Sequence, residues 1–209
     1  MLIAREGWPY VVVLLVLGCL PLVFRFYWLG GFFLALAIFT LFFFRDPERV
    51  APPGANLVLS PADGKVVVAG AAPDANPLGP GAIQISIFLS IFDVHVNRAP
   101  IAGRIAKVEY NQGDFLPAFD DKASLRNEQN AVTIEEGSKR LVFKQIAGLI
   151  ARRIVFRKQV GDTVAAGERV GLIKFGSRVD VFLPPGSVLL VKKGDRVSAG
   201  VSILGEFPR

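Results

Sequence analysis

Cysteine and histidine are almost absent from this sequence of 209 residues, which contains one of each. A single cysteine excludes a disulfide-stapled scaffold, and the two residues together supply too few ligands for a Cys-rich or His-rich metal site. Glycine-rich phosphate loops, Walker motifs and dinucleotide fingerprints are also missing. Charged residues make up only 20% of the chain and hydrophobic residues 52%, a balance that excludes intrinsic disorder. We therefore expect a folded protein without a bound metal.

Charge is missing altogether from two stretches near the N-terminus, residues 8–24 and 26–44, which only Arg25 separates. As helices they would be roughly 26 and 28 Å long, close to the ~30 Å hydrocarbon core of a bilayer. We expect residues 1–45 to form a hydrophobic helical hairpin that anchors the chain in the cell membrane, either spanning it or entering it shallowly. Basic residues flank both ends of the hairpin, so the positive-inside rule places the rest of the chain on the cytoplasmic side.

Residues 46–209 differ in composition, because short runs of Val, Ile and Phe alternate with Gly, Pro, Asn and Asp. This pattern is typical of short strands joined by tight turns. The sequence G-D-x-V-x-x-G at residues 161–167 recurs at residues 194–200, and a short apolar run follows each copy. Such paired hairpins resemble those of lipoyl and biotinyl carrier domains. We expect a mostly β domain, a compact barrel or sandwich with lipoyl-like (barrel-sandwich hybrid) hairpins and two-fold pseudo-symmetry in its C-terminal part.

The formal net charge of +6 favours an anionic partner. Given the hydrophobic hairpin, we expect this partner to be the membrane surface and not a nucleic acid. Basic residues gather at 139–144 and 152–158. They could face lipid headgroups, or they could simply keep strand edges from aggregating, and the sequence leaves both readings open.

Three separate positions could carry chemistry. His95 is the only histidine, and general acid–base catalysis near neutral pH most often uses this residue, although a lone histidine in a strand is more often structural. Asp63 precedes Gly64 in a pattern that also forms ordinary hairpin turns. Ser177 follows Gly176 between two apolar segments and lacks the G-x-S-x-G context of serine hydrolases. These residues alone leave the function open.

Six short motifs resemble, in order, those of the short, archaeal-type form of phosphatidylserine decarboxylase, a family of pyruvoyl-dependent proenzymes. They are residues 44–49 (FRDPER), 60–66 (SPADGKV), 88–100, 127–130 (NEQN), 145–154 and 175–180 (FGSRVD). The similarity covers about residues 40–207. It implies a membrane-bound lyase of phospholipid biosynthesis that converts phosphatidylserine to phosphatidylethanolamine.

The resemblance also implies that the proenzyme cleaves itself by serinolysis. Ser177 would attack the carbonyl carbon of Gly176, giving a β chain of residues 1–176 and an α chain of residues 177–209. These two chains would form a heterodimer, and further dimerisation is conceivable because the β-rich body has exposed edges. Ser177 would end as a covalent pyruvoyl group, the only cofactor expected, which forms a Schiff base with the lipid substrate.

In this scheme His95, oriented by Asp63, would accept the Ser177 proton and later reprotonate the product. The larger bacterial form of the family has a second histidine three residues further on, where this chain has Arg98. Either His95 serves both steps or Arg98 contributes electrostatically. A different class of function also fits the sequence, a membrane-anchored non-enzymatic adaptor with a lipoyl-like barrel, in which Lys174 would be the candidate for modification.

Overall fold

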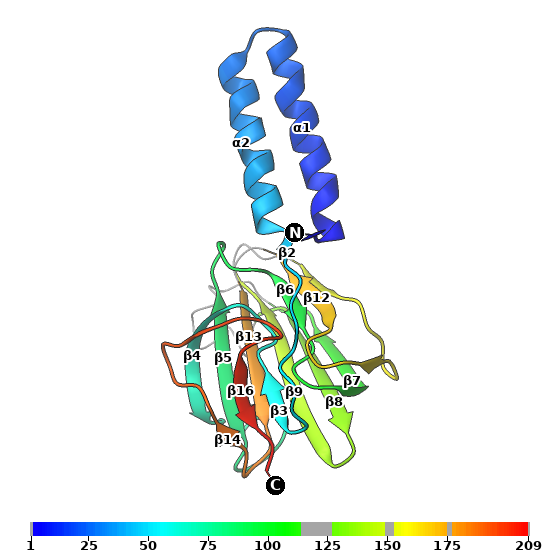
Figure 1. Cartoon of the computed structure of the whole chain (residues 1–209), viewed down its shortest axis with the longest axis vertical. Helices are drawn as coiled ribbons and strands as arrows, with labels where there is room; N and C mark the ends of the chain where they lie inside the picture. Colours follow the sequence, from blue (N-terminus) through cyan, green and yellow to red (C-terminus); the bar gives the residue numbers. More distant parts are fainter. Residues whose placement is uncertain (1, 114–126, 149–152, 175–176, 209) are drawn as a thin grey trace. The chain divides into compact units, whose positions relative to one another are not determined.

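The computed structural model describes four stretches of the chain: residues 2–113, 127–148, 153–174 and 177–208. The chain divides into two compact units, Met1–Glu48 and Arg49–Arg209. The first unit is mainly helical, and the second is built from β-strands (Figure 1).

The first unit is a helical hairpin with a short antiparallel strand pair. Its elements are β1 (Leu2–Ile3), the 3-10 helix η1 (Arg5–Gly7), α1 (Trp8–Val23), α2 (Tyr27–Phe43) and β2 (Arg45–Asp46). Two glycines lie where the helices meet: a Cβ at Gly18 would be 2.8 Å from Cδ2 of Leu34, and one at Gly30 would be 2.8 Å from the Gly18 oxygen. Small residues at such positions let two helix backbones approach closely, as they do in membrane helix pairs.

The outward surface of this hairpin is apolar. Large hydrophobic side chains are exposed along both helices, among them Val12, Val13, Val16, Leu20, Phe32 and Ile38. The helical segment Arg5–Val23, with 19 residues, is long and apolar enough to cross a membrane, whereas α2, with 17, is shorter. The predicted N-terminal helical pair is confirmed.

The second unit contains an eight-stranded antiparallel sheet and two small sheets. The large sheet has the order β11-β7-β8-β9-β13-β5-β4-β15, and the small sheets have the orders β10-β12-β6 and β14-β16-β3. The strands are β3 (Leu57–Leu59), β4 (Gly64–Ala71), β5 (Ile83–Leu89), β6 (Val96–Arg98), β7 (Gly103–Asn111), β8 (Gln129–Glu136), β9 (Lys139–Ala147), β10 (Ile154–Phe156), β11 (Thr163–Val164), β12 (Arg169–Ile173), β13 (Ser177–Leu183), β14 (Val188–Leu189), β15 (Arg196–Val197) and β16 (Ile203–Glu206).

The large sheet curls into a half-barrel, and its interior face carries the hydrophobic core. Alternate residues of β5, β8, β9 and β13 point to this face. They include Ile85, Ile87, Leu89, Val132, Ile134, Leu141, Phe143, Val179 and Val181. With 41% strand and 19% helix, the predicted mostly β fold is confirmed.

The sequence repeat corresponds to two similarly built halves. In one half β15 pairs with the start of β4, and in the other β11 pairs with the start of β7. The turn before each short strand has the same hydrogen bond, from Gly194 N to Val66 O in one half and from Gly161 N to Ile105 O in the other, both at 2.8 Å. Each half also contains one small three-stranded sheet, β14-β16-β3 in the half with β15 and β10-β12-β6 in the half with β11. The pairing shifts register at equivalent positions, between Ile203 and Gly205 of β16 and between Arg169 and Gly171 of β12. The duplication therefore extends well beyond the two G-D-x-V-x-x-G segments.

Candidate active site

Ser177 is the first residue of β13, which lies between β5 and β9 in the large sheet. It stands opposite Leu89 on one side and Ala147 on the other. Because Val179 faces the core, Ser177 two residues earlier points to the same interior face. Its side chain is fully buried, and within the described part of the chain its Oγ has no hydrogen-bond partner. Gly176, the predicted other side of the scissile bond, lies outside the described residues.

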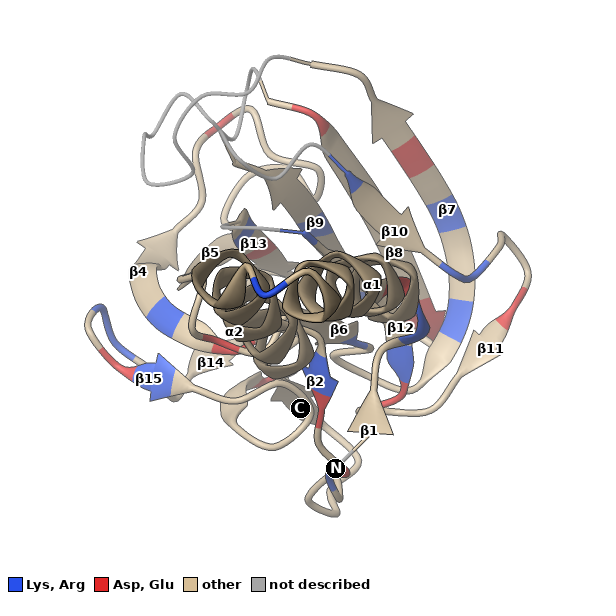
Figure 2. Ribbon diagram, turned by 90° about the horizontal axis from the view of Figure 1, so that it is seen from above, with Lys and Arg blue, Asp and Glu red and all other residues tan. Residues whose placement is uncertain are grey.

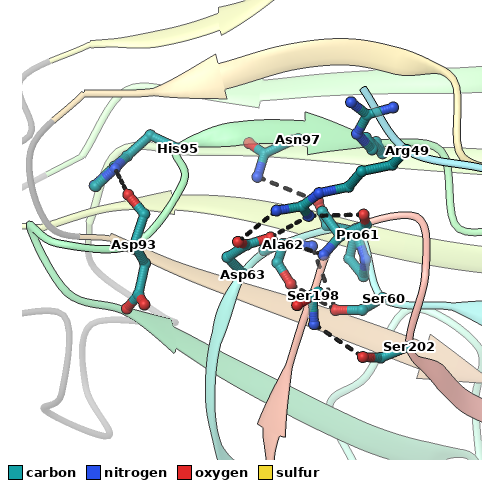
Figure 3. A network of polar contacts seen from close by, with 12 residues as sticks. Arg49, Ser60, Pro61, Ala62, Asp63, Asp93, His95, Asn97, Ser198 and Ser202 are labelled. Carbon is teal, nitrogen blue, oxygen red and sulfur yellow. Dashed lines mark hydrogen bonds and ion pairs between the residues drawn. The ribbon is translucent and has the colours of Figure 1, made fainter. Parts of the chain in front are cut away.

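A chain of buried amides crosses the interior face next to Ser177. Asn130 Nδ2 donates to Gln145 Oε1 at 3.0 Å, and Gln145 Nε2 donates to Asn97 Oδ1 at 2.9 Å. Asn97 Nδ2 then contacts the Pro61 oxygen at 3.4 Å, as Figure 3 shows. These bonds tie β6 to β8 and β9. Sequence reasoning noticed the motifs that contain these residues but could not pair the amides, because each comes from a different element.

His95 lies just before β6 and is buried, with 2% of its surface exposed. Its Nδ1 is 2.9 Å from the carbonyl oxygen of Asp93 (Figure 3). A carbonyl can only accept, so Nδ1 carries the hydrogen and Nε2 keeps the lone pair that could take up a proton.

Backbone contacts limit the separation of His95 and Ser177, although no hydrogen bond joins their side chains in the described structure. The Ile173 amide donates to the His95 oxygen at 3.3 Å. Ser177 follows Ile173 by four residues, which limits the separation of their Cα atoms to about 14 Å even in a fully extended chain. Asn97, two residues after His95, contacts Gln145, and Gln145 lies two residues before Ala147, the neighbour of Ser177.

Asp63 has a different partner from the predicted one. Two guanidinium nitrogens of Arg49 donate hydrogen bonds to the Asp63 carboxylate, at 2.5 Å and 2.8 Å (Figure 3). The Ala199 amide donates to Oδ1 of Asp63 at 2.8 Å. A bidentate guanidinium is among the strongest partners a carboxylate can have. The His95 ring contacts the Asp93 carbonyl, whereas the Asp63 carboxylate accepts hydrogen bonds from Arg49 and the Ala199 amide. Arg49 belongs to the FRDPER motif, but no local pattern links it to Asp63.

Arg98 points away from the predicted site. Its guanidinium donates to the Gly167 oxygen at 2.9 Å. Neighbouring residues of a strand project to opposite sides, so Arg98 lies across β6 from Asn97 and the interior amides.

The residue after Ser177 enters a second buried polar cluster, on the opposite face of β13. Arg178 Nε donates to Asp180 Oδ1 at 2.6 Å, and its terminal nitrogen donates to Ser86 Oγ at 2.9 Å. Gln84 completes the cluster through Ser86 and Asp180. The charges of Arg178 and Asp180 compensate each other, so both can be buried. Their alternation with apolar residues would ordinarily indicate a solvent-facing side, which is why the sequence did not reveal this cluster.

Outside this site, the charged residues of the described stretches are dispersed. Figure 2 shows Lys and Arg on β4, β7 and β15 and not gathered at one place. In the basic region predicted from sequence, Lys139 pairs with Glu136 at 3.1 Å and Arg140 with Glu135 at 3.7 Å. These pairs neutralise part of the charge at the start of β9, an inner strand of the large sheet, and Arg152 of the second basic segment lies outside the described residues.

Comparison with known proteins agrees with the six motifs. The sequence profile of the phosphatidylserine decarboxylase family matches residues 36–205. A phosphatidylserine decarboxylase proenzyme of Symbiobacterium thermophilum is 46% identical over 209 residues, covering 100% of this chain and 97% of the relative. One of Solibacter usitatus is 54% identical over 182 residues, 85% of each chain, and one of Burkholderia mallei is 46% identical over 213 residues, 99% and 96%. The predicted resemblance is thus confirmed, and the chain belongs to the phosphatidylserine decarboxylase family of carboxy-lyases.

Proposed function

We propose that this protein decarboxylates phosphatidylserine to phosphatidylethanolamine in phospholipid biosynthesis, and that it matures by cutting its own chain between Gly176 and Ser177. The observation that carries the proposal is the position of Ser177 in a chain of this family. Its hydroxyl is buried on the interior face, at the first residue of a strand held on both sides.

The surroundings of Ser177 suit an intramolecular attack. Pairing with β5 and β9 keeps β13 in place, so proximity can replace an external protease. His95 Nε2 is the proton acceptor for the hydroxyl, since Nδ1 is occupied by the Asp93 oxygen. Asp63 contributes by holding Arg49 and Ala199 together next to the Pro61 turn. The amide chain through Asn97 maintains β6, and with it His95, over the sheet.

Ser177 is also well placed to become the covalent pyruvoyl group. After cleavage the α chain, residues 177–209, still pairs with the β chain through β13, β15 and β16. The Arg178–Asp180 cluster fixes the residue next to the new terminus. When formed, the group supplies an electron sink for loss of carbon dioxide. The chain's own contribution is a buried position for residue 177, with the buried His95 as the proton donor for the product.

We propose that the hairpin of α1 and α2 anchors the protein in the cell membrane, with the β domain on the cytoplasmic side. The support is its uncharged, outward-facing apolar surface and the basic residues at its ends. The test is flotation of the full chain with phospholipid vesicles in 1 M salt, and the expected result is that the protein stays bound. Release by salt would contradict apolar insertion, because only surface electrostatic binding is screened.

Denaturing mass spectrometry of the purified protein tests the self-cleavage. Expected are a fragment of residues 1–176 and one of residues 177–209 with a blocked N-terminus, together with decarboxylation of vesicles that contain phosphatidylserine. Ser177→Ala removes the attacking hydroxyl, so both fragments and activity should disappear. Ser138→Ala, at an exposed turn, is the matched control and should behave like the parent. An intact parent chain that decarboxylates lipid would overturn the proposal, and an intact inactive chain would favour the adaptor alternative.

A further inference from the structure

Glu128, in the NEQN motif of residues 127–130, aligns with Ser177 across neighbouring strands of the large sheet. The Ala147 amide donates to the Glu128 oxygen at 2.9 Å, which extends the pairing of β8 with β9 by one residue. Ala147 is in turn directly opposite Ser177. Directly opposite residues of neighbouring strands project to the same face. Glu128, Ala147 and Ser177 therefore follow one another across the interior face.

Two strand spacings separate Glu128 from residue 177 in this row. Their backbones are two strand spacings of about 4.8 Å apart, and a glutamate side chain extends over roughly half of that distance. The residue between them is Ala147, which contributes only a methyl group. Both side chains are withdrawn from solvent, with 6% of Glu128 and none of Ser177 exposed. Because about 5 Å remains even for a side chain directed at residue 177, the carboxylate acts on residue 177 through one water molecule.

Tyr110 lies on the other side of Glu128 from Ser177. It stands opposite Asn130, so it is diagonal to Glu128 on the same face and within reach of it. Burial, a side-chain hydrogen bond with Glu128 and the charge of Glu128 all raise the pKa of Tyr110. The phenol therefore stays protonated at neutral pH and can donate to the carboxylate. Tyr110 is 58% exposed, so the pair also connects the buried carboxylate with solvent.

Conversion of Ser177 into a new chain end removes two protons from one residue. The first leaves Oγ when the hydroxyl attacks the Gly176 carbonyl, and it ends on the released amide nitrogen, leaving an ester. The second leaves Cα: the C–H electron pair becomes the Cα=Cβ double bond, the Cβ–Oγ bond breaks, and Gly176 departs as a carboxylate. His95 serves the first transfer in the scheme above, and the second also requires a base.

We infer that Glu128 is the base that takes the Cα proton of residue 177, with Tyr110 holding its carboxylate. This inference rests on the self-cleavage proposed above. His95 belongs to the β6 layer, whereas Glu128 comes along the large sheet from the β9 side. The two groups therefore belong to different sheets, which allows each to serve a different atom of residue 177.

The test uses Glu128→Gln in the full chain, which keeps the shape of the side chain and removes the base. The expected result is elimination slowed at least ~100-fold, so that the ester accumulates at the mass of the uncut chain. Hydroxylamine should then split it and release residues 177–209 with a free serine at the N-terminus. Glu128→Asp should restore part of the self-cleavage. Glu135→Gln, on the same strand in a surface pair with Arg140, is the matched control and should cleave like the parent.

Each outcome decides the inference. A Glu128→Gln chain that cleaves at the parental rate overturns it. A chain that stays whole and resists hydroxylamine also overturns it, because Glu128 would then act before the ester or only in folding. Parent and Ser177→Ala are run alongside: a parent that does not cleave defeats the proposed function itself. Tyr110→Phe, at an exposed position, should leave folding unchanged and slow the release of ester several-fold, and an unchanged rate would remove Tyr110 from the scheme.

Discussion

The two halves of the β domain share a scaffold and differ in the residues that bear on chemistry. The first half is built from residues 57–66 and 188–206, and the second from residues 96–105 and 154–173. Their turns, short strands and small sheets correspond. The first half ends at the C-terminus, whereas β12 of the second half leads directly to Ser177.

The differences fall at matched positions. Asp63, with its Arg49 partner, occupies the place that Ala102 has in the second half, and Asn97 occupies the place of the core residue Val58. His95 precedes β6 as Asn56 precedes β3. Both copies of the duplicated scaffold can therefore stabilise the domain through the same turns and strand pairs. The matched positions in each copy can carry different polar residues.

The largest loss of stability should come from substituting the two glycines at matched positions of the halves, Gly64 and Gly103. Gly64 has φ 152° and Gly103 has φ 149°, and a Cβ at either would meet a backbone carbonyl of the neighbouring strand. We expect Gly64→Ala and Gly103→Ala each to lower the free energy of unfolding by on the order of 3 kcal/mol or more. Urea unfolding of the full chain in detergent measures this. Gly31→Ala, with open space around it, is the control, and clearly unequal losses would break the equivalence of the halves.

The Asn97–Val58 difference predicts the next effect. Asn97→Val should cost about 2–3 kcal/mol of stability, because Gln145 is fully buried and would lose the acceptor for its amide. Self-cleavage should slow as well, since β6 carries the neighbourhood of His95. Unfolding in urea and fragment masses measure the two effects. A stable variant with normal cleavage would show that the amide chain is dispensable.

The Asp63–Ala102 difference comes third. Asp63→Asn should cost about 2 kcal/mol, because Arg49 and Asp63 are largely buried and the charged partner is lost. Ala102→Asp, in the matched place, should change stability by less than about 1 kcal/mol, since the site is only half-buried and could offer the Ala166 amide. If Asp63→Asn reduces self-cleavage far more than it reduces stability, Asp63 takes part in the chemistry and not only in the fold.

The smallest effect on stability should come from the ion pair between Lys158 and Glu168 in the second half. Burial raises the pKa of Glu168, but hydrogen bonds from Lys158 and the Ala165 amide outweigh it, so the pKa lies below the ordinary 4.5. Ionised Glu168 therefore stabilises the folded state at pH values above the ordinary pKa of 4.5, and this stabilisation is lost as the pH falls through the lowered pKa. Glu168→Gln should cost well under 1 kcal/mol at pH 7. Its difference from the parent in urea titrations should shrink as the pH falls below 4.5, and a difference that grows on acidification would contradict the assignment.

Local patterns were sufficient for much of the architecture. Uncharged runs on both sides of Arg25 predicted the helical pair, because helix length and burial depend mainly on nearby residues. Alternating strands and Gly-Asp turns predicted the β domain, and the repeat predicted its pseudo-symmetry. The order of the six motifs identified the family and directed attention to Ser177 and His95.

Partners from distant elements could not be obtained in this way. The family resemblance implied that Asp63 orients His95, and only the structure showed that Arg49 binds the Asp63 carboxylate with two hydrogen bonds. Glu128 was part of a recognised motif, but its alignment with Ser177 depends on the register of β8, β9 and β13.

By itself, then, the sequence determined the family, the helical hairpin and the strand-rich domain, and it singled out the serine proposed to carry the chemistry, because these follow from local motifs, composition and spacing. Only the tertiary structure decided which polar groups share the interior with that serine. Strand register and sheet curvature bring side chains from separate parts of the chain to one face, and no single segment contains that information.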